Sequence, residues 1–565
     1  MDLQQQTQFP IITSATSWWK EQIIYQIYPR SFKDSSGNGI GDLRGIINKL
    51  DYIKSLGVTA VWINPIYASP NDDNGYDISD YRAILPEFGS MSDFDELIVG
   101  LHERNLLFVM DLVVNHSSDE HDWFKASRSS RDNPYRNYYH WWPAEKGKPN
   151  YRYSYFDEAG DAWQYDKQTD AYYLHYFSKK QPDLNWENPT VRQEVYHIME
   201  FWINKGVDGF RLDAFQFVSK DETFPKLPDG YEKTGKGVIK HHGMGPNIHA
   251  YLREMNEQVL TPHNVFAVSE GAGSSFEDAH SIVDESRKAL QMVYHFDAVD
   301  MGKDIHNPHT LADFKRIHTA WEQAFSNEGW LSIFLANHDS PRLVSRFGND
   351  SPLYRDVSAK LLNTFLLSMR GTPYCYFGDE LGMTNSDFKD IDDYQDIAAK
   401  NGYKKVLSEG GNTTEYMQYL RAFSRDHSRT PMQWDDSGYA GFSERKPWLP
   451  VNANKTLVNV CHQQVDEQSV LNHFRKMTRL RLENKVLIYG EYGLLAPDHA
   501  QIYMYQRSLL HTNMLVILNF SDQQAEIDIP ASFTNATLLI NNYSTLHKQN
   551  RSVNLLAYQA VILSV

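Results

Sequence analysis

Residues 209–215, GFRLDAF, form an apolar run that contains an arginine and an aspartate two positions apart. Because side chains alternate between the two faces of a strand, Arg211 and Asp213 are expected to point to the same side. A buried charge needs a partner, and an arginine beside a carboxylate favours its ionised form. An ionised carboxylate can act as a nucleophile, although a structural ion pair at a strand end would have the same sequence.

Three other apolar runs also end in ionisable side chains. In chain order these side chains are Asp111 and His116, then Glu270, then His338 and Asp339. Runs of this kind, separated by helix-length intervals, are typical of parallel strands whose carboxyl ends meet at one rim. The sequence therefore predicts an α/β fold, a (β/α)8 TIM barrel with its chemistry at that rim.

The length of the chain leaves room for more than the barrel. It has 565 residues with 41% hydrophobic content, whereas such a barrel needs about 250 residues. Residues 117–186 are rich in Tyr, Trp, Asp and Gly, and we expect an inserted subdomain there, after the third strand. Short β-rich runs in 490–565 predict a C-terminal antiparallel β-sandwich. Residues 1–116 and 187–489 are then the barrel, and a polar, Gly-rich excursion at 387–448 is expected to be a lid.

Composition excludes several partner classes. The net charge is −17 and no long basic run is present, which excludes nucleic acid and anionic membranes as partners. The two cysteines, Cys375 and Cys461, indicate a reducing compartment, and no signal peptide or membrane-length apolar segment is evident. We expect a cytoplasmic protein, a monomer or a homodimer, with a small neutral partner. The 13% aromatic content suits sugar rings, and equally a large core.

The segment 34–45, DSSGNGIGDLRG, follows the first predicted strand. Its alternate positions are Asp34, Ser36, Asn38, Ile40 and Asp42. Oxygen ligands at every second residue, with glycine for a sharp turn, are typical of a Ca²⁺ loop, and a polar Gly-rich turn has the same composition. We expect a structural calcium site here and no organic cofactor.

Tyr76 and Asp77 lie beside a glycine in the polar loop 69–81. An exposed aromatic ring next to a carboxylate can stack on a sugar face while the carboxylate accepts hydroxyl protons. A turn with an Asx cap is the alternative interpretation.

Four of these motifs together resemble a known family. DLVVNH (111–116), GFRLDA (209–214), the Glu270 segment and NHD (337–339) are similar in order and spacing to the signature regions of the α-amylase superfamily, glycoside hydrolase family 13. QPDLNW (181–186) resembles the additional signature of its oligo-1,6-glucosidase and α-glucosidase group. The resemblance covers essentially the whole chain.

The resemblance implies a role for each matching residue. Asp213 would be the nucleophile, Glu270 the general acid/base, and Asp339 the carboxylate that stabilises the transition state. The implied substrate-binding residues are Tyr76, Asp77, His116, Phe177, Arg211, Ala214, His338 and Arg429. Among them, Asp77 and Arg429 would grip the 4-hydroxyl of the terminal glucose and so restrict the enzyme to chain ends. Relatives often carry Asn and Asp where this chain has Ser36 and Asn38, which implies weak calcium binding.

The implied function is a retaining, exo-acting α-glucosidase that hydrolyses short oligosaccharides through a covalent glycosyl-aspartate. A sucrose isomerase or α-glucosyltransferase of the same family is the alternative, but isomerases carry an RLDRD-type stretch where this chain has DMGKD at 300–304. A non-catalytic, amylase-like subunit is a third interpretation, and the filled motif positions argue against it. Ala214 is smaller than the valine that accompanies α-1,6 preference in relatives, which predicts cleavage of maltose-type or sucrose-type bonds at least as well as isomaltose.

Overall fold

The computed structural model describes residues 17–157 and 160–565, so the predictions for the first 16 residues lie outside it. Eight parallel strands form one sheet in the order β11-β10-β9-β5-β2-β1-β13-β12. A parallel bridge between Val293 and Leu331 joins its two ends, and the (β/α)8 barrel is confirmed. The strands are β1 (Ile24–Ile27), β2 (Ala60–Ile63), β5 (Leu107–Val113), β9 (Gly209–Asp213), β10 (Phe266–Glu270), β11 (Met292–Tyr294), β12 (Ser332–Ile333) and β13 (Thr372–Tyr376).

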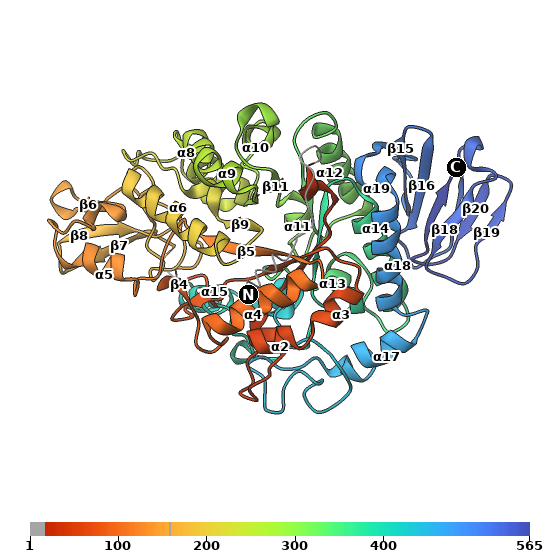
Figure 1. Cartoon of the computed structure of the whole chain (residues 1–565), viewed down its shortest axis with the longest axis horizontal. Coiled ribbons are helices and arrows are strands. Elements are labelled where there is room, and N and C mark those ends of the chain that lie inside the picture. Colours follow the sequence, from red (N-terminus) through yellow and green to blue (C-terminus); the bar gives the residue numbers. More distant parts are fainter. Residues whose placement is uncertain (1–16, 158–159) are drawn as a thin grey trace, which may run out of the picture.

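Helices cover the outside of this barrel (Figure 1). The longest are α4 (Met91–Glu103), α6 (Pro189–Ile203), α12 (Leu311–Ala324), α14 (Arg355–Ser368) and α18 (Val470–Glu483). Their starts are fixed by local hydrogen bonds: Ser90 forms a capping box with Asp93 at α4, and Thr310 forms one with Asp313 at α12. The buried residues of α4 recur at helical spacing, so one face packs on the sheet.

The barrel interior is a packed hydrophobic core rather than a channel. Alternate residues of β1, β2, β5, β10, β11 and β13 supply it, including Trp62, Phe266 and Tyr374. The intervening residues face the helices, which is why strands such as β9 are buried along their whole length. Because the interior is filled, ligands have access only at the rims of the barrel.

Two excursions rise above the carboxyl-terminal rim. Between β5 and α6, a three-stranded antiparallel sheet of order β6-β8-β7 (Trp141–Pro143, Ala171–Leu174, Trp163–Asp166) accompanies α5 (Asp122–Ser129), at the left of Figure 1. The second excursion, predicted to be a lid, contains α15 (Ile397–Ser408) and α16 (Thr413–Phe423). Both contribute residues to the main pocket.

The C-terminal strands form two antiparallel sheets, at the right of Figure 1. One has the order β14-β15-β16-β21-β18 and the other β17-β20-β19. Their bounds are β14 (Glu491–Leu495), β15 (Ile502–Leu509), β16 (Thr512–Asn519), β17 (Ala525–Asp528), β18 (Thr537–Asn541), β19 (His547–Gln549), β20 (Ser552–Leu555) and β21 (Ala560–Ser564). A separate apolar cluster that includes Ile517, Phe533 and Val553 lies between them.

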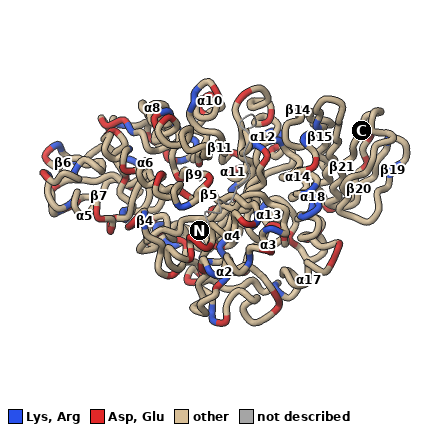
Figure 2. The backbone as a smooth tube through the Cα atoms, viewed as in Figure 1, with Lys and Arg blue, Asp and Glu red and all other residues tan. Residues whose placement is uncertain are grey.

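Lys and Arg residues alternate with Asp and Glu residues along the described backbone (Figure 2). Across the described residues, no helix is both long and apolar enough to cross a membrane.

Candidate active site

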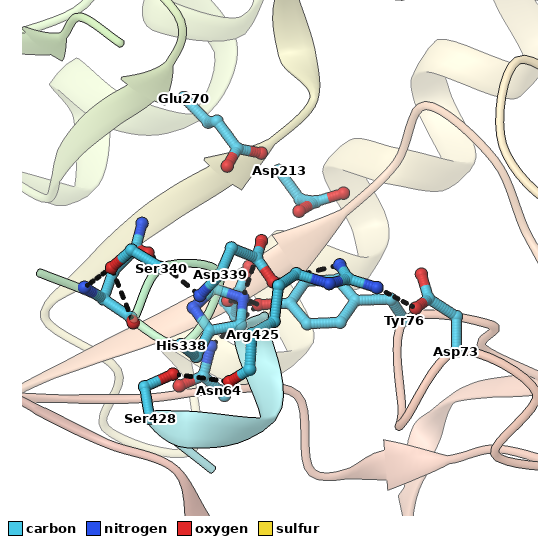
Figure 3. Close-up of polar contacts among 12 residues, drawn as sticks. Asn64, Asp73, Tyr76, Asp213, Glu270, His338, Asp339, Ser340, Arg425 and Ser428 are labelled. Atoms are coloured by element: carbon cyan, nitrogen blue, oxygen red, sulfur yellow. Dashed lines mark hydrogen bonds and ion pairs between the residues drawn. The ribbon is translucent and has the colours of Figure 1, made fainter. Parts of the chain in front are cut away.

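The carboxyl ends of β9 and β10 lie side by side and deliver Asp213 and Glu270 to the same rim. The two strands are parallel neighbours in which Ser269 pairs with Leu212, so the next residues lead into the pocket. Figure 3 shows the two carboxyl groups close together, with Asp339 below them. All three line one pocket with a volume of about 690 Å³. This juxtaposition is the one that the strand-end pattern predicts.

Arg211 lies beneath these carboxylates and is fully buried. Its Nη1 donates to Asp213 Oδ1 at 2.5 Å and to Asp111 Oδ1 at 2.9 Å. Its Nη2 forms an ion pair with Glu270 Oε1. The sequence predicts an ion pair of Arg211 with Asp213 alone, whereas in the structure the guanidinium contacts the carboxylates of Asp111, Asp213 and Glu270.

The proton affinities of the two facing carboxyl groups differ. Burial raises the pKa of Glu270 to about 8; Arg211 opposes this rise, and the charge of Asp213 adds to it. Burial raises the pKa of Asp213 to about 7, against the lowering effect of Arg211. Glu270 therefore holds its proton more tightly, and between these two values it is the acid while Asp213 carries the negative charge.

Asp339 is the strongest acid of the three. Burial opposes its ionisation, but neighbouring positive charges hold the pKa of its carboxyl well below the usual range. Arg425 Nη1 donates to Asp339 Oδ1 at 3.1 Å and Arg429 Nη2 donates to it at 2.7 Å. A carboxylate fixed by two guanidinium groups stays ionised throughout the working pH range.

Tyr76 and His116 line the pocket, and His338 is fully buried behind Tyr76. The rings of Tyr76 and His338 are stacked with centroids 5.3 Å apart and planes at 7°. Tyr76 Oη donates to Asp111 Oδ2 at 2.9 Å and accepts from Asn64 at 2.7 Å. Burial lowers the pKa of His338, and likewise that of His116, to about 3. Both imidazoles are therefore neutral hydrogen-bonding groups near pH 7.

Asp77 does not reach the pocket. It is fully buried, and its carboxylate accepts hydrogen bonds from Ser69 Oγ (3.0 Å) and from the backbone N–H groups of Asp72 (2.9 Å) and Asp73 (3.1 Å). It closes the turn by accepting from residues that precede it, whereas an Asx cap accepts from residues that follow it. Asp73 lines the pocket in its place.

Arg429 also lies behind the pocket wall. It is only 1% exposed, and its Nε donates to the backbone carbonyl of His338 at 2.9 Å. Arg425 lines the pocket instead, 3.7 Å from Asp73 Oδ1 (Figure 3). The charged pair at this end is therefore Asp73 and Arg425, a correction to the predicted pair of Asp77 and Arg429.

Phe177 and Ala214 both line the pocket as predicted. Phe177 stacks on Tyr155, with centroids 5.3 Å apart and planes at 16°. Ala214 has a left-handed backbone, φ 47°, and its N–H donates to Glu270 Oε2 at 2.8 Å. Other lining residues that the motifs do not identify are Tyr155, Phe156, Gln216, Phe217, Asp300, Lys303, Asp396, Asn401 and Lys405.

The predicted calcium loop is closed by its own hydrogen bonds. Asp34 Oδ1 accepts from the backbone N–H groups of Ser36 (2.9 Å) and Gly37 (2.7 Å). Asp34 Oδ2 accepts from the N–H of Gly39 (2.8 Å) and from Ser443 Oγ (2.6 Å). Both oxygens are thus directed at hydrogen-bond donors.

The remaining ligand candidates are used in the same way. Asp42 caps α2 (Leu43–Ile47) through the N–H of Gly45 at 2.6 Å, and Asn38 Oδ1 accepts from the N–H of Ile40 at 2.8 Å. In the described part of the chain, no group of three or more His, Cys, Asp or Glu side chains is arranged to hold a metal. The carboxylates of Asp34 and Asp42 both accept from the N–H of Ser36, at 2.9 and 3.2 Å, so these two candidate ligands lie close together. Calcium binding there stays a prediction from the sequence.

The fold and the arrangement of acidic groups at its rim correspond to one known family. The family described as alpha amylase, catalytic domain, matches residues 26–490. The chain belongs to the alpha-amylase family.

Individual members of the alpha-amylase family are similar to the chain over nearly its full length. The oligo-1,6-glucosidase of Bacillus cereus is 48% identical over 557 residues, 97% of this chain and 99% of that protein. The oligo-1,6-glucosidase of Parageobacillus thermoglucosidasius is 49% identical over 538 residues, 93% and 95% of the two chains.

Among solved structures, the trehalulose synthase MutB from Pseudomonas mesoacidophila MX-45 has a TM-score of 0.93 and 41% identity, covering 97% of this chain and 99% of its own. The isomaltulose synthase PalI from Klebsiella sp. LX3 has the same score and identity, with 97% and 100% coverage.

Proposed function

We propose that this member of the alpha-amylase family is a retaining, exo-acting α-glucosidase that releases terminal glucose from short oligosaccharides. The observation that carries the proposal is a pocket with the Asp213 and Glu270 carboxyl groups on its wall and the charged pair Asp73 and Arg425 at one end. The oligo-1,6-glucosidases that are similar over nearly the whole chain support the same substrate class.

The first chemical step forms a glycosyl ester. Asp213 Oδ attacks the anomeric carbon while Glu270 gives its proton to the glycosidic oxygen, so the C–O bond to the leaving sugar breaks and a neutral alcohol departs. The higher pKa of Glu270 places the proton on the correct group before the reaction begins. Asp339, kept ionised by Arg425 and Arg429, offsets the positive charge that develops on the ring.

The second step hydrolyses the ester. Glu270, now a carboxylate, takes a proton from water, the resulting hydroxide attacks the anomeric carbon, and the bond to Asp213 breaks. Glu270 is protonated again and Asp213 is ionised, so the enzyme returns to its starting state. Two displacements at the same carbon retain its configuration.

The closed end of the pocket explains the exo action that we propose. Asp73 accepts and Arg425 donates hydrogen bonds, so together they suit the hydroxyls of a terminal sugar. The guanidinium of Arg425 also lies over the Phe156 ring at 4.9 Å, and Asn401 Nδ2 donates to the Phe156 carbonyl at 2.9 Å. These contacts join the two excursions beside this charged pair, which supports a pocket that accepts only a chain end.

Trapping the ester tests the assignment. We expect 5-fluoro-α-glucosyl fluoride to label the enzyme, and mass spectrometry of peptides to locate the sugar on Asp213. Asp213→Asn should remain folded by circular dichroism, take no label and lose turnover. A label on another carboxylate, or near-wild-type hydrolysis by Asp213→Asn, would refute the assignment.

Sucrose isomerisation is the second candidate, because trehalulose and isomaltulose synthases are among the similar solved structures. On the pocket wall, Lys303 pairs with Asp300 at 2.9 Å, in the stretch where the isomerases that resemble this chain carry arginines. A wall of this kind is less able to hold released fructose for a second attack, which favours hydrolysis. Glucose and fructose are the expected products from sucrose, and trehalulose or isomaltulose as main products would favour the isomerase.

A cytoplasmic location is also part of the proposal. Buried Cys375 and exposed Cys461 are both free thiols, which suits a reducing compartment.

A further inference from the structure

Tyr294 forms hydrogen bonds with both Arg211 and Glu270. It is the last residue of β11, the parallel neighbour of β10, and the strand register pairs Glu270 directly with Tyr294. Register partners in a parallel sheet send their side chains to the same side. Tyr294 is 3% exposed, and its hydroxyl lies between Arg211 and Glu270.

The hydrogen bonds of this hydroxyl have only one consistent direction. Arg211 Nε donates to Tyr294 Oη at 3.1 Å and Arg211 Nη2 donates to it at 2.9 Å. Arg211 has no acceptor atom, so both lone pairs of the hydroxyl are used by the guanidinium. The hydroxyl proton is then left for Glu270 Oε1, which lies 3.1 Å away. Burial raises the pKa of Tyr294 well above its usual value, so this proton stays in place.

The five N–H groups of Arg211 are thereby all assigned. Nη1 serves Asp213 and Asp111, Nε serves Tyr294, and Nη2 is shared by Tyr294 and Glu270. The arginine makes its two hydrogen bonds to carboxylates of β5 and β9 with the same nitrogen. Tyr294 links this arginine to the proposed acid/base on β10, because it accepts from Arg211 and donates to Glu270.

The two oxygens of Glu270 consequently differ. Oε1 accepts the hydrogen bond of Tyr294 and forms the ion pair with Arg211, so it does not carry the acidic proton. Oε2 accepts only the N–H of Ala214 among the described residues and has a lone pair left for a proton. When that proton leaves for the glycosidic oxygen, negative charge develops on the carboxyl group and the Tyr294 hydrogen bond strengthens.

We propose that Tyr294 is a positioning residue for the acid/base of this reaction: its hydroxyl fixes Oε1 of Glu270 as an acceptor, so that Oε2 donates the catalytic proton. The inference rests on the proposed role of Glu270. It identifies a residue that acts through Glu270 and does not touch the substrate.

The first test is Tyr294→Phe. Loss of a donor to the carboxylate makes Glu270 a weaker acid, so the alkaline limb of the kcat/KM profile should move to higher pH. Hydrolysis of maltose should fall about tenfold, because its leaving group needs protonation. Hydrolysis of p-nitrophenyl α-glucoside, whose leaving group needs little protonation, should fall less.

Tyr374→Phe is the matched control. Tyr374 lies in the same interior cluster, is 4% exposed, and its hydroxyl has no hydrogen-bond partner among the described residues. Removing that hydroxyl should leave the profile and both rates unchanged. A general effect of deleting a hydroxyl from the barrel interior would appear in both variants.

A second variant should shift the alkaline limb of the kcat/KM profile in the opposite direction. Replacement of Tyr294 by 3-fluorotyrosine keeps the ring and strengthens the donor, so the alkaline limb should move to lower pH. This variant keeps the proposal testable if the phenylalanine variant does not fold. An unmoved limb in the fluorinated enzyme, or equal losses on both substrates in Tyr294→Phe, would overturn the proposal. Full activity of Glu270→Gln would instead refute the proposed function itself.

Discussion

Two aspartates four residues apart, Asp73 and Asp77, should give opposite phenotypes when each is replaced by alanine. Asp77 is fully buried and accepts three hydrogen bonds at 2.9–3.1 Å. At about 1 kcal/mol net for each bond, Asp77→Ala should cost roughly 2–4 kcal/mol of unfolding free energy. The part of the enzyme that remains folded should retain a kcat/KM on maltose within about threefold of wild type, since nothing in the pocket is removed.

Asp73→Ala should lower the activity of the enzyme and leave its stability almost unchanged. Asp73 lines the pocket, and a charged hydrogen bond to a sugar hydroxyl contributes about 1.5–3 kcal/mol, so kcat/KM on maltose should fall roughly 10- to 100-fold. Arg425 retains Asp339 and Asp396 as partners, so the melting temperature should change little.

Thermal unfolding and initial rates, normalised to active sites by trapping, measure both quantities for each variant. If Asp77→Ala loses activity at unchanged stability while Asp73→Ala stays active, the assignment of the pocket end to Asp73 is wrong. Asp73→Asn, which keeps the shape of the side chain, separates loss of charge from loss of packing.

The remaining predictions concern pH, metal and linkage. The kcat/KM profile should be bell-shaped: activity is lost below pH 7 as Asp213, with a pKa of about 7, gains a proton, and above pH 8 as Glu270, with a pKa of about 8, loses one. A chelator such as EDTA should leave the melting temperature unchanged because Asp34 and Asp42 already bond to donors, and a fall that calcium restores would favour the calcium loop predicted from the sequence. Ala214→Val should raise the isomaltose-to-maltose ratio of kcat/KM by roughly tenfold, and an unmoved ratio would assign linkage preference to other loops.

Strand ends were predictable because burial and alternation leave a strong pattern in the sequence. Asp213, Glu270 and Asp339 follow apolar runs, and parallel strands bring such ends together whatever the details of the loops.

Which loop side chains face the pocket was not predictable in the same way. In DDNGYD, the aspartates at 73 and 77 have equal chemistry, and only the turn decides which one faces the pocket. Arg425 and Arg429 present the same ambiguity. The role of Tyr294 was not predictable for another reason: a tyrosine in an apolar run has the pattern of a core residue, and its contact with Glu270 depends on a strand register that the sequence does not specify.

The left-handed backbone at Ala214 connects linkage preference with the position of the Glu270 carboxyl group. Its side chain lines the pocket, where we predict that it meets the leaving sugar, while its N–H donates to Oε2 of Glu270 at 2.8 Å. With φ at 47°, a β-branched side chain is strained by about 1–2 kcal/mol, and the peptide can relieve that strain only by turning its N–H away. A collection of variants at this one position should therefore show linkage preference and the alkaline pH limit changing together. Selection for a new substrate bond at residue 214 would alter the acid that cleaves it.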